Sequence, residues 1–381
     1  MDCKIIQGDC LEVMRSYPDN YFSCVCTDPP YGLLFMGKGW DHEVPGVEYW
    51  KECFRCIKPG GHILAMGGSR TFHRLAFAME ESGFELRDTI MWIYGSGFPK
   101  SHNHFGISGF GTALKPAYEP IIMAMRPCDG TFKQNYEKWG QAGINIDGCR
   151  IECQKPPCNN TSFVSWRNLE NRNDIQPAKQ TYDQSKGRWP ANLILDEVAA
   201  TQLDEQSGEL SGPKKERIGR KGGKGFGFFD DEKTANMNSR WPGDSGGGAS
   251  RFFYCAKTSS RERNEGLEGM PDVPGGSNAK GYTLDVANGN DRNKPTKNYH
   301  PTVKPLKLMR YLITLIMPPK DGILLDPFAG SGSTIIAAHQ LGVKAIGIEK
   351  QAEYVEIANK RLEYYMNTKE DKDLDLFDTA V

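Results

Sequence analysis

Apolar residues in the first third of the chain recur with two different spacings. Short apolar runs that are typical of buried strands occur at 23–26, 62–66 and 90–93. Between the last two runs, residues 70–82 carry apolar side chains at helical spacing and stop at Gly83. This alternation of strands with a helix predicts a layered α/β fold.

The same pattern returns after residue 300. It predicts helices at 306–316, 333–341 and 352–365 and strands at 322–325 and 345–348. The middle of the chain differs, because Gly, Asn, Lys, Arg and scattered aromatics replace the long apolar runs there. The pattern therefore divides the chain into regular segments at 1–125 and 299–366, an inserted region at 126–298 and a charged, flexible tail at 367–381.

Composition narrows the class of protein. A length of 381 residues exceeds what one core usually supports, which predicts two lobes or one domain with a large insertion. The formal charge of −1 neither supports nor excludes a nucleic-acid partner. Eleven cysteines at irregular spacing, without an apolar leader, predict reduced thiols in a cytoplasmic protein. A mean hydropathy of −0.56, with no long apolar run, argues against a membrane role.

A glycine-bearing turn follows the predicted strand at 322–325. Its sequence is Asp326-Pro327-Phe328-Ala329-Gly330-Ser331-Gly332-Ser333-Thr334, and a predicted helix comes next. Open α/β sheets bind ligands at this position, and the lack of a full G-x-G-x-x-G pattern favours a nucleoside over a dinucleotide. Glu349 ends the next strand, where a carboxylate can accept hydrogen bonds from both ribose hydroxyls. The alternative is a turn that merely connects a strand to a helix.

A second candidate site follows the strand at 23–26. Thr27 leads into Asp28-Pro29-Pro30-Tyr31, whose two prolines end the strand and stiffen the turn. Asp28 offers a carboxylate, Pro29 offers a fixed backbone carbonyl, and Tyr31 offers a ring that can stack on a planar group. Rigid acceptors of this kind suit an amino group whose lone pair must be freed for attack. The alternative is a Pro-Pro turn with no chemical role.

Together the two motifs resemble those of the amino-methyltransferases of DNA, whose D-P-P-Y and F-x-G-x-G patterns match 28–31 and 328–332. Their order resembles the β class, in which a Rossmann-like S-adenosylmethionine-dependent methyltransferase fold is circularly permuted and carries a large inserted target-recognition region. Further matches are Gly8-Asp9-Cys10, 58–61 and 300–305. The resemblance implies that 1–125 is the catalytic half, 126–298 the target-recognition region and 299–366 the cofactor-binding half.

The resemblance also implies a role for each residue of the tetrapeptide. Asp28 and the Pro29 carbonyl would hold the amino hydrogens of a base flipped out of double-stranded DNA, and Tyr31 would stack on that base. Pro30 would keep the turn rigid. Because the enzymes that methylate cytosine N4 more often carry S-P-P-Y, Asp28 favours adenine N6 as the target.

S-adenosylmethionine is the cofactor that the resemblance implies. Its expected contacts are Asp9, Thr302, Lys304, Asp326, Pro327, Phe328, Gly330, Gly332, Thr334 and Glu349. Asp9 is expected near the adenine of the cofactor and Glu349 at its ribose. Thr302 and Lys304 are expected near its methionine end.

Several alternatives stay open at this point. Cytosine N4 is the second target, and RNA or a protein glutamine are further substrates because a related tetrapeptide serves them. A DNA-binding protein that keeps the fold without turnover is an alternative of another class, and an NAD-dependent oxidoreductase is the least favoured. A partner restriction endonuclease and a homodimer are consistent with the class, but no residue pattern decides either.

Other residue clusters have a structural interpretation beside a functional one. Cys53 and Cys56 are predicted to be buried thiols of a helix rather than half of a zinc clamp. No metal is assigned to three cysteines of the insertion: Cys149, Cys153 and Cys158. The basic stretch 214–224 either contacts phosphates or is a solvated loop. Three adjacent pairs either clamp nucleic acid or belong to the core: Trp166–Arg167, Arg188–Trp189 and Arg240–Trp241.

Overall fold

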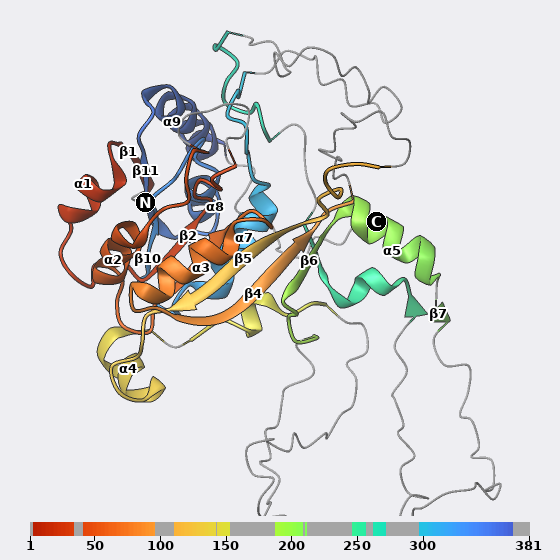
Figure 1. Cartoon of the computed structure of the whole chain (residues 1–381), viewed down its shortest axis with the longest axis horizontal. Coiled ribbons are helices and arrows are strands. Elements are labelled where there is room, and N and C mark those ends of the chain that lie inside the picture. The colour runs from red at the N-terminus through yellow and green to blue at the C-terminus, as the bar shows by residue number, and fades with distance from the viewer. Residues whose placement is uncertain are drawn as a thin grey trace, which may run out of the picture.

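The computed structural model describes residues 3–33, 41–95, 110–141, 143–152, 187–208, 210–211, 246–256, 262–271 and 297–368. Within these residues, nine strands form one sheet (Figure 1). In spatial order they are β1 (Cys3–Gln7), β11 (Lys344–Glu349), β10 (Ile323–Asp326), β2 (Cys24–Thr27), β3 (His62–Met66), β5 (Tyr118–Met125), β4 (Glu85–Ile93), β6 (Leu193–Asp196) and β9 (Tyr254–Ala256). β5 is antiparallel to β3 and β4, and the other neighbours are parallel. A separate pair joins β7 (Leu210–Ser211) to β8 (Gly246–Gly247).

Helices cover both faces of the sheet. One face packs on α1 (Cys10–Arg15), α2 (Val47–Cys56) and α3 (Phe72–Glu81). The other packs on α7 (Leu306–Ile316), α8 (Ser333–Gln340) and α9 (Ala352–Asn367). Successive residues of a strand point to opposite faces, so Val25 joins the first core while Cys24 and Cys26 join the second. The expected α/β layering is therefore confirmed.

Two further helices and two 3-10 turns lie within the described residues. They are α4 (Phe132–Trp139), α5 (Glu197–Ser207), η3 (Asp147–Cys149) and η6 (Ala249–Phe252). The expected strand at 62–66 and helix at 306–316 are confirmed with the same bounds. β4 begins at Glu85 rather than at 90, because its first four residues are exposed and are held by pairing with β5 rather than by an apolar pattern.

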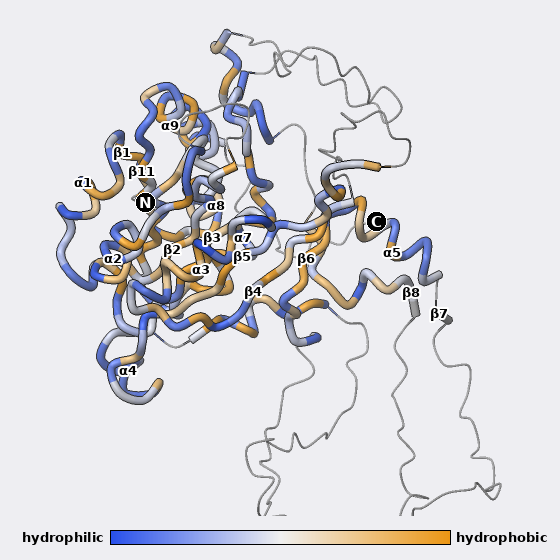
Figure 2. Tube along the Cα trace, viewed as in Figure 1, coloured by the Kyte–Doolittle hydropathy of each residue, from blue (hydrophilic) through white to orange (hydrophobic). Residues whose placement is uncertain are grey.

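Part of the region expected to be an insertion belongs to the main sheet. β6 pairs with β4, and β9 pairs with β6. Tyr254 of β9 stacks on Tyr311 of α7 with ring centroids 3.9 Å apart, and Cys149 is buried in the same core. In Figure 2 the strongly apolar stretches follow the sheet, including β6. These runs of three or four residues are too short to show a periodicity in the sequence.

The cysteine, basic and Trp–Arg clusters noted in the sequence lie only partly within the described residues. Cys53 and Cys56 are buried thiols of α2, as expected. Trp189 is 51% exposed, with the Arg150 guanidinium 5.4 Å from its ring centroid. Residues outside the described ranges include Cys153, Cys158, the stretch 214–224 and the pairs at 166–167 and 240–241.

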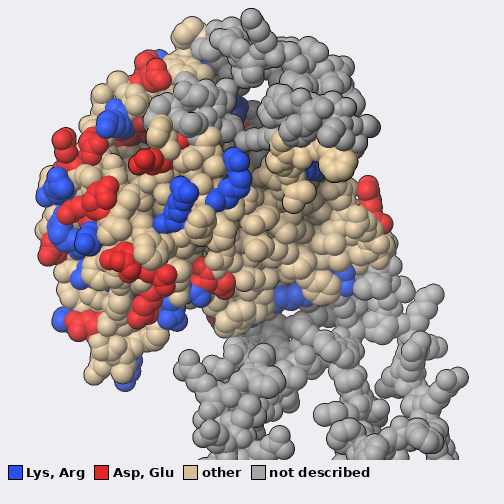
Figure 3. Space-filling view, viewed as in Figure 1, with Lys and Arg blue, Asp and Glu red and all other residues tan. Residues whose placement is uncertain are grey.

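The described surface carries both signs of charge. Acidic and basic side chains are interspersed on the face shown in Figure 3. No helix of the described residues is both long enough and apolar enough to cross a bilayer.

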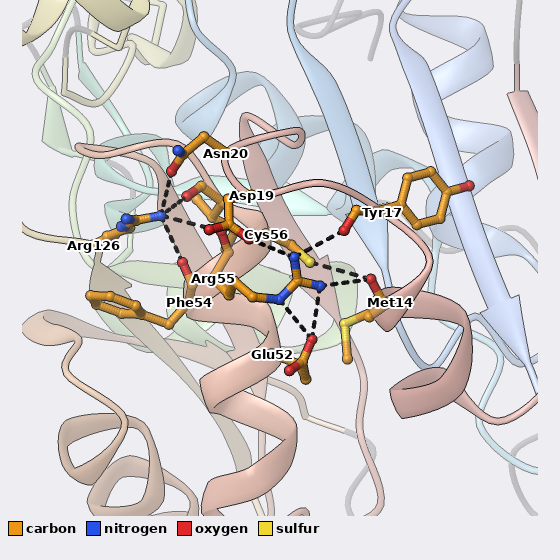
Figure 4. Close-up of polar contacts among 10 residues, drawn as sticks. Met14, Tyr17, Asp19, Asn20, Glu52, Phe54, Arg55, Cys56 and Arg126 are labelled. Atoms are coloured by element: carbon orange, nitrogen blue, oxygen red, sulfur yellow. Dashed lines mark hydrogen bonds and ion pairs between the residues drawn. The ribbon is translucent and has the colours of Figure 1, made fainter.

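Arg126 joins the end of α2 to the loop that precedes β2. Its Nη1 donates to the carbonyl oxygens of Phe54 at 2.9 Å, Arg55 at 3.4 Å and Ile57, and to Asn20 Oδ1 at 2.7 Å (Figure 4). Burial lowers the pKa of the guanidinium, but an arginine stays charged at neutral pH. The cation therefore satisfies carbonyl groups at the negative end of the helix dipole.

We expect Arg126→Met to lower the free energy of unfolding by about 3 kcal/mol, because several partly buried carbonyl oxygens lose a charged donor. Urea unfolding followed by circular dichroism measures this loss. The control is Arg87→Met on β4, whose side chain is 44% exposed and reaches Glu85 at 3.5 Å, and we expect a change within about 0.5 kcal/mol. Equal losses in the two variants would contradict the assigned role of Arg126.

Candidate active site

The two sequence motifs meet where the strand order reverses. From β10 the chain continues to β11 on one side, whereas from β2 it continues to β3 on the other, and β10 and β2 are neighbours. Leu324 pairs with Cys24 and Leu325 with Val25, so both strands end at the same level. Open α/β sheets bind ligands at such a switch point. A cavity of about 990 Å³ lies there and is lined by residues of both motifs.

A buried hydrogen bond joins the ends of these two strands. Thr27 Oγ1 donates to Asp326 Oδ1 at 2.7 Å, and the Phe328 amide donates to the same oxygen at 3.1 Å. Burial raises the pKa of Asp326 to about 6, although bonds from Thr334, Thr27 and Phe328 oppose that rise. The Asp326 side chain therefore fixes the start of the glycine turn against the strand that carries the tetrapeptide.

The tetrapeptide is part of a cluster of four polar side chains. Asp28 Oδ1 accepts from the Tyr31 hydroxyl at 2.7 Å, and Asp28 Oδ2 lies 3.1 Å from Lys304 Nζ. Lys304 Nζ also donates to Glu119 Oε2 at 2.9 Å. Glu119 Oε2 lies 3.2 Å from the Tyr31 hydroxyl. Two carboxylates, one ammonium and one phenol thus share a single site.

Burial and charge set the protonation of this cluster. Burial raises the pKa of Asp28, Lys304 lowers it, and Glu119 raises it further. Burial alone would lower the pKa of Lys304, but Asp28 and Glu119 outweigh it, so the pKa of the ammonium is raised. Burial and the two carboxylates raise the pKa of Tyr31 well above its usual value. Lys304 is therefore a cation and Tyr31 a neutral hydroxyl at physiological pH.

Asp41 holds the backbone of the tetrapeptide in place. Its Oδ1 accepts from the amides of Tyr31 at 2.6 Å and Gly32 at 2.9 Å, and its Oδ2 accepts from Leu33 at 3.2 Å. Thr71 Oγ1 donates to the Tyr31 carbonyl at 2.7 Å. Gly32 has φ +64°, which favours glycine. Sequence reasoning missed Asp41, since no motif marks a carboxylate ten residues beyond the tyrosine that it anchors.

We expect Asp41→Ala to reduce turnover by about tenfold or more, because three amides of the catalytic turn lose their acceptor. Asp41→Asn keeps one acceptor oxygen and should lie between the alanine variant and the wild type. Single-turnover methyl transfer measures the effect. Glu80→Ala on α3 is the control, because Glu80 is exposed and does not line the cavity, and an equal loss there would contradict the anchoring role.

Glu349 and the glycine turn form the other end of the cavity. Glu349 Oε2 accepts from the Gly330 amide at 2.9 Å and Oε1 accepts from the Gln351 amide at 2.8 Å. Burial raises the pKa of Glu349, and these backbone bonds lower it. Gly330 has φ +52°, and a Cβ there would lie 2.7 Å from His300 Nε2. A side chain at Gly330 would therefore be both strained and blocked.

A buried arginine supports the same turn from behind. Arg361 of α9 is fully buried, and its Nη1 donates to the Ser331 carbonyl at 2.6 Å and to Ser333 Oγ at 3.3 Å. Gly332 has φ +81°, and a Cβ there would lie 3.0 Å from Ala358 Cβ. The turn is thus packed closely against α9, and Gly332 serves that packing.

The structure brings the expected site residues to one cavity, with one exception. The described residues that line it include Asp9, Asp28, Pro29, Pro30, Tyr31, Thr302, Lys304, Asp326, Pro327, Phe328, Gly330, Thr334 and Glu349. Gly332 is not among them. Lys304, expected beside the methionine end of a cofactor, has its ammonium on Asp28 and Glu119. Asp9 caps α1 through the Leu11 amide at 3.0 Å and pairs with Lys350 at 3.1 Å.

These residues fit S-adenosylmethionine. A carboxylate accepts up to about four hydrogen bonds, and backbone amides take two on Glu349, so its oxygens can still accept ribose hydroxyls. Gly330 has a positive φ and no side chain, which permits close approach of a ligand to the turn. Asp28 lines the same cavity, where its carboxylate can accept an amino group.

Comparison with known proteins finds relatives that match part of this chain. Among curated proteins, the type II methyltransferase M.HinfI of Haemophilus influenzae is 36% identical over 154 residues, which are 35% of this chain and 41% of that protein. The type II methyltransferase M2.DpnII of Streptococcus pneumoniae is 48% identical over 65 residues, which are 17% of this chain and 24% of that protein. The chain thus matches less than half the length of these relatives.

Solved structures and a family description extend the comparison. The PvuII DNA methyltransferase, described as cytosine-N4-specific, aligns with 98% of this chain and 88% of its own at 16% identity and a TM-score of 0.44. The complex of M1.HpyAVI with S-adenosylmethionine aligns with 94% of this chain and 98% of its own at 16% identity and a TM-score of 0.42. The family model described as DNA methylase matches residues 22–360. Since that match covers most of the sequence, the chain belongs to the DNA methylase family, the S-adenosylmethionine-dependent amino-methyltransferases of adenine N6 and cytosine N4.

Proposed function

We propose that this protein transfers a methyl group from S-adenosylmethionine to adenine N6 in double-stranded DNA. One observation carries the proposal: the Asp28 carboxylate and the glycine turn with Glu349 line the same cavity at the switch point of the sheet. Two half-sites of one reaction, one for a nucleoside cofactor and one for an amino group, explain both motifs.

The residues of the chain would perform the reaction by positioning. When bound, S-adenosylmethionine supplies an electrophilic methyl group on a sulfonium. Asp28 and the Pro29 carbonyl accept the amino hydrogens of the flipped base, which favours a pyramidal nitrogen with an exposed lone pair. The Tyr31 ring stacks on the base. Its hydroxyl already donates to Asp28 Oδ1, so a bound base competes with Tyr31 for that oxygen.

Adenine N6 is the preferred target because the first residue of the tetrapeptide is an aspartate, Asp28. Cytosine N4 presents a similar amino group and is the alternative target of the same site. We also propose that the fold is circularly permuted and that 126–298 contains the target-recognition region beside the strands β6 and β9 that extend the main sheet. The chain order supports this, since the strand with the glycine turn comes late in the sequence yet lies beside β2.

The biological setting is part of the proposal. Both curated relatives are named type II methyltransferases, which supports a role in a restriction–modification system, with a cognate endonuclease as partner. A homodimer and a cytoplasmic location also stay predictions. Gel filtration with light scattering tests the first, and fractionation of expressing cells tests the second.

The function is tested by incubating the purified protein with unmethylated double-stranded DNA and S-adenosylmethionine. Sequencing that detects modified bases should find N6-methyladenine in a fixed sequence context, and far less of it after the same incubation with Asp28→Ala. N4-methylcytosine instead would overturn the choice of base. Binding of DNA and cofactor without any methylation would favour a non-catalytic DNA-binding protein.

A further inference from the structure

Glu119 is an acidic residue of the cavity that sequence reasoning left without a role. It lies near the start of β5, whose Ile121 pairs with Met66 at the end of β3. Because β5 is antiparallel to β3, its first residues reach the edge at which β2 and β3 end. The side chain of Glu119 is 23% exposed, and it comes from β5, which is separated by β3 from the strand that precedes the tetrapeptide.

Glu119 shares the Lys304 ammonium with Asp28. An ammonium has three N–H donors, and those of Lys304 reach Asp28 Oδ2 at 3.1 Å, Glu119 Oε2 at 2.9 Å and the Tyr31 hydroxyl oxygen at 3.2 Å. The Lys304 side chain is 8% exposed, so water contributes little to its solvation. Two carboxylates and one ammonium leave the cluster with one net negative charge.

We propose that Glu119 is a positioning residue that shares the Lys304 ammonium with Asp28, so that the oxygens of the Asp28 carboxylate stay available as acceptors for the amino group of the base. The inference rests on the proposed function, since it assigns Glu119 a part in the same reaction. Glu119 Oε2 also offers an acceptor for the Tyr31 hydroxyl once a base displaces that hydroxyl from Asp28.

The charges in the cluster make this role necessary. Without Glu119, the Lys304 ammonium would donate mainly to Asp28. A carboxylate that is fully paired with an ammonium is a weaker acceptor for another donor. Without Lys304, Asp28 and Glu119 would be two carboxylates in one buried site, where neither ionises easily. Glu119 therefore divides the donors of Lys304 between two carboxylates, and the Lys304 cation offsets the repulsion between those carboxylates.

Other titratable groups also face the cluster. They are Cys26 from the β2 side, Tyr94 after β4 and Asp326 at the end of β10, and Asp196 at the end of β6 lies near Tyr94. Tyr31, Tyr94 and Cys26 have raised pKa values, with burial as the largest cause, and stay neutral near pH 7. Asp326 and Asp196 are present in every variant compared below.

Glu119→Gln tests the role in the wild-type background. We expect the single-turnover rate to fall about tenfold. The acid limb of its pH profile should move to lower pH, because removal of the Glu119 charge lowers the pKa of Asp28, which must be ionised. Glu119→Asp should recover part of the rate. Glu81→Gln, an exposed residue of α3, is the control and should change neither quantity.

Lys304→Met provides a second background for Glu119→Gln, so that the conclusion does not depend on the folding of one variant. It should move the acid limb to higher pH by about one unit or more, because Asp28 loses its cation and keeps a like charge. Adding Glu119→Gln to Lys304→Met should move the limb back and raise the rate. The same substitution is thus harmful beside Lys304 and beneficial without it, which a merely structural role does not produce.

The outcomes separate this inference from the proposed function. If the wild type methylates DNA but Glu119→Gln lowers the rate equally in both backgrounds, or leaves the acid limb in place, Glu119 has no charge-partitioning role. A wild type that binds S-adenosylmethionine yet methylates no DNA overturns the proposed function instead. Opposite shifts of the acid limb in the two single variants, with recovery in the double variant, support the inference.

Discussion

Asp28→Ala will transfer methyl groups to DNA roughly a thousandfold more slowly than the wild type, because the amino group loses its charged acceptor in a preorganised site. The variant should still bind S-adenosylmethionine with a Kd within about tenfold of the wild type. Asp28 lies partly buried beside Lys304 and Tyr31, whereas Glu349 lies at the glycine turn. Catalysis and cofactor binding should therefore separate.

Single-turnover transfer of labelled methyl groups measures the rate, and isothermal titration measures cofactor affinity. Asp28→Asn is the matched variant, since it keeps the shape and one oxygen but removes the charge, and it should recover little activity. Tyr31→Ala should be milder, because it removes a stacking partner and leaves Asp28 as an acceptor. Unchanged methylation by Asp28→Ala would show that the catalytic assignment is wrong.

Glu349→Ala should weaken S-adenosylmethionine binding by about a hundredfold. Two hydrogen bonds from ribose hydroxyls to a carboxylate are worth about 3 kcal/mol together. The alanine also leaves the amides of Gly330 and Gln351 without their acceptor. The turn itself should therefore loosen, with a lower melting temperature in the absence of cofactor.

Isothermal titration of the cofactor, beside thermal unfolding of each protein, separates these two effects. Glu349→Gln retains one acceptor oxygen and should bind with intermediate affinity. Glu353→Ala, an exposed residue in the first turn of α9, is the control and should bind like the wild type. Wild-type affinity in Glu349→Ala would refute its assignment to the ribose.

Much of the site can be predicted from the sequence because its signals are local. The run from Asp28 to Tyr31 and the turn from Asp326 to Thr334 each follow an apolar strand directly. A strand followed by prolines or glycines has few conformations open to it. Such segments show their structure and their chemical groups without reference to the rest of the chain.

The rest depends on contacts between distant segments. The sequence by itself determined the α/β layering, the two motifs and the carboxylate at Glu349. Only the tertiary structure decided that β6 and β9 extend the sheet, that Asp41 anchors the turn of the tetrapeptide, and that Glu119 shares Lys304 with Asp28. Glu119 and Lys304 are 185 residues apart, and an antiparallel strand brings them together. Pairing of that kind is set by burial across the whole sheet, which no local pattern encodes.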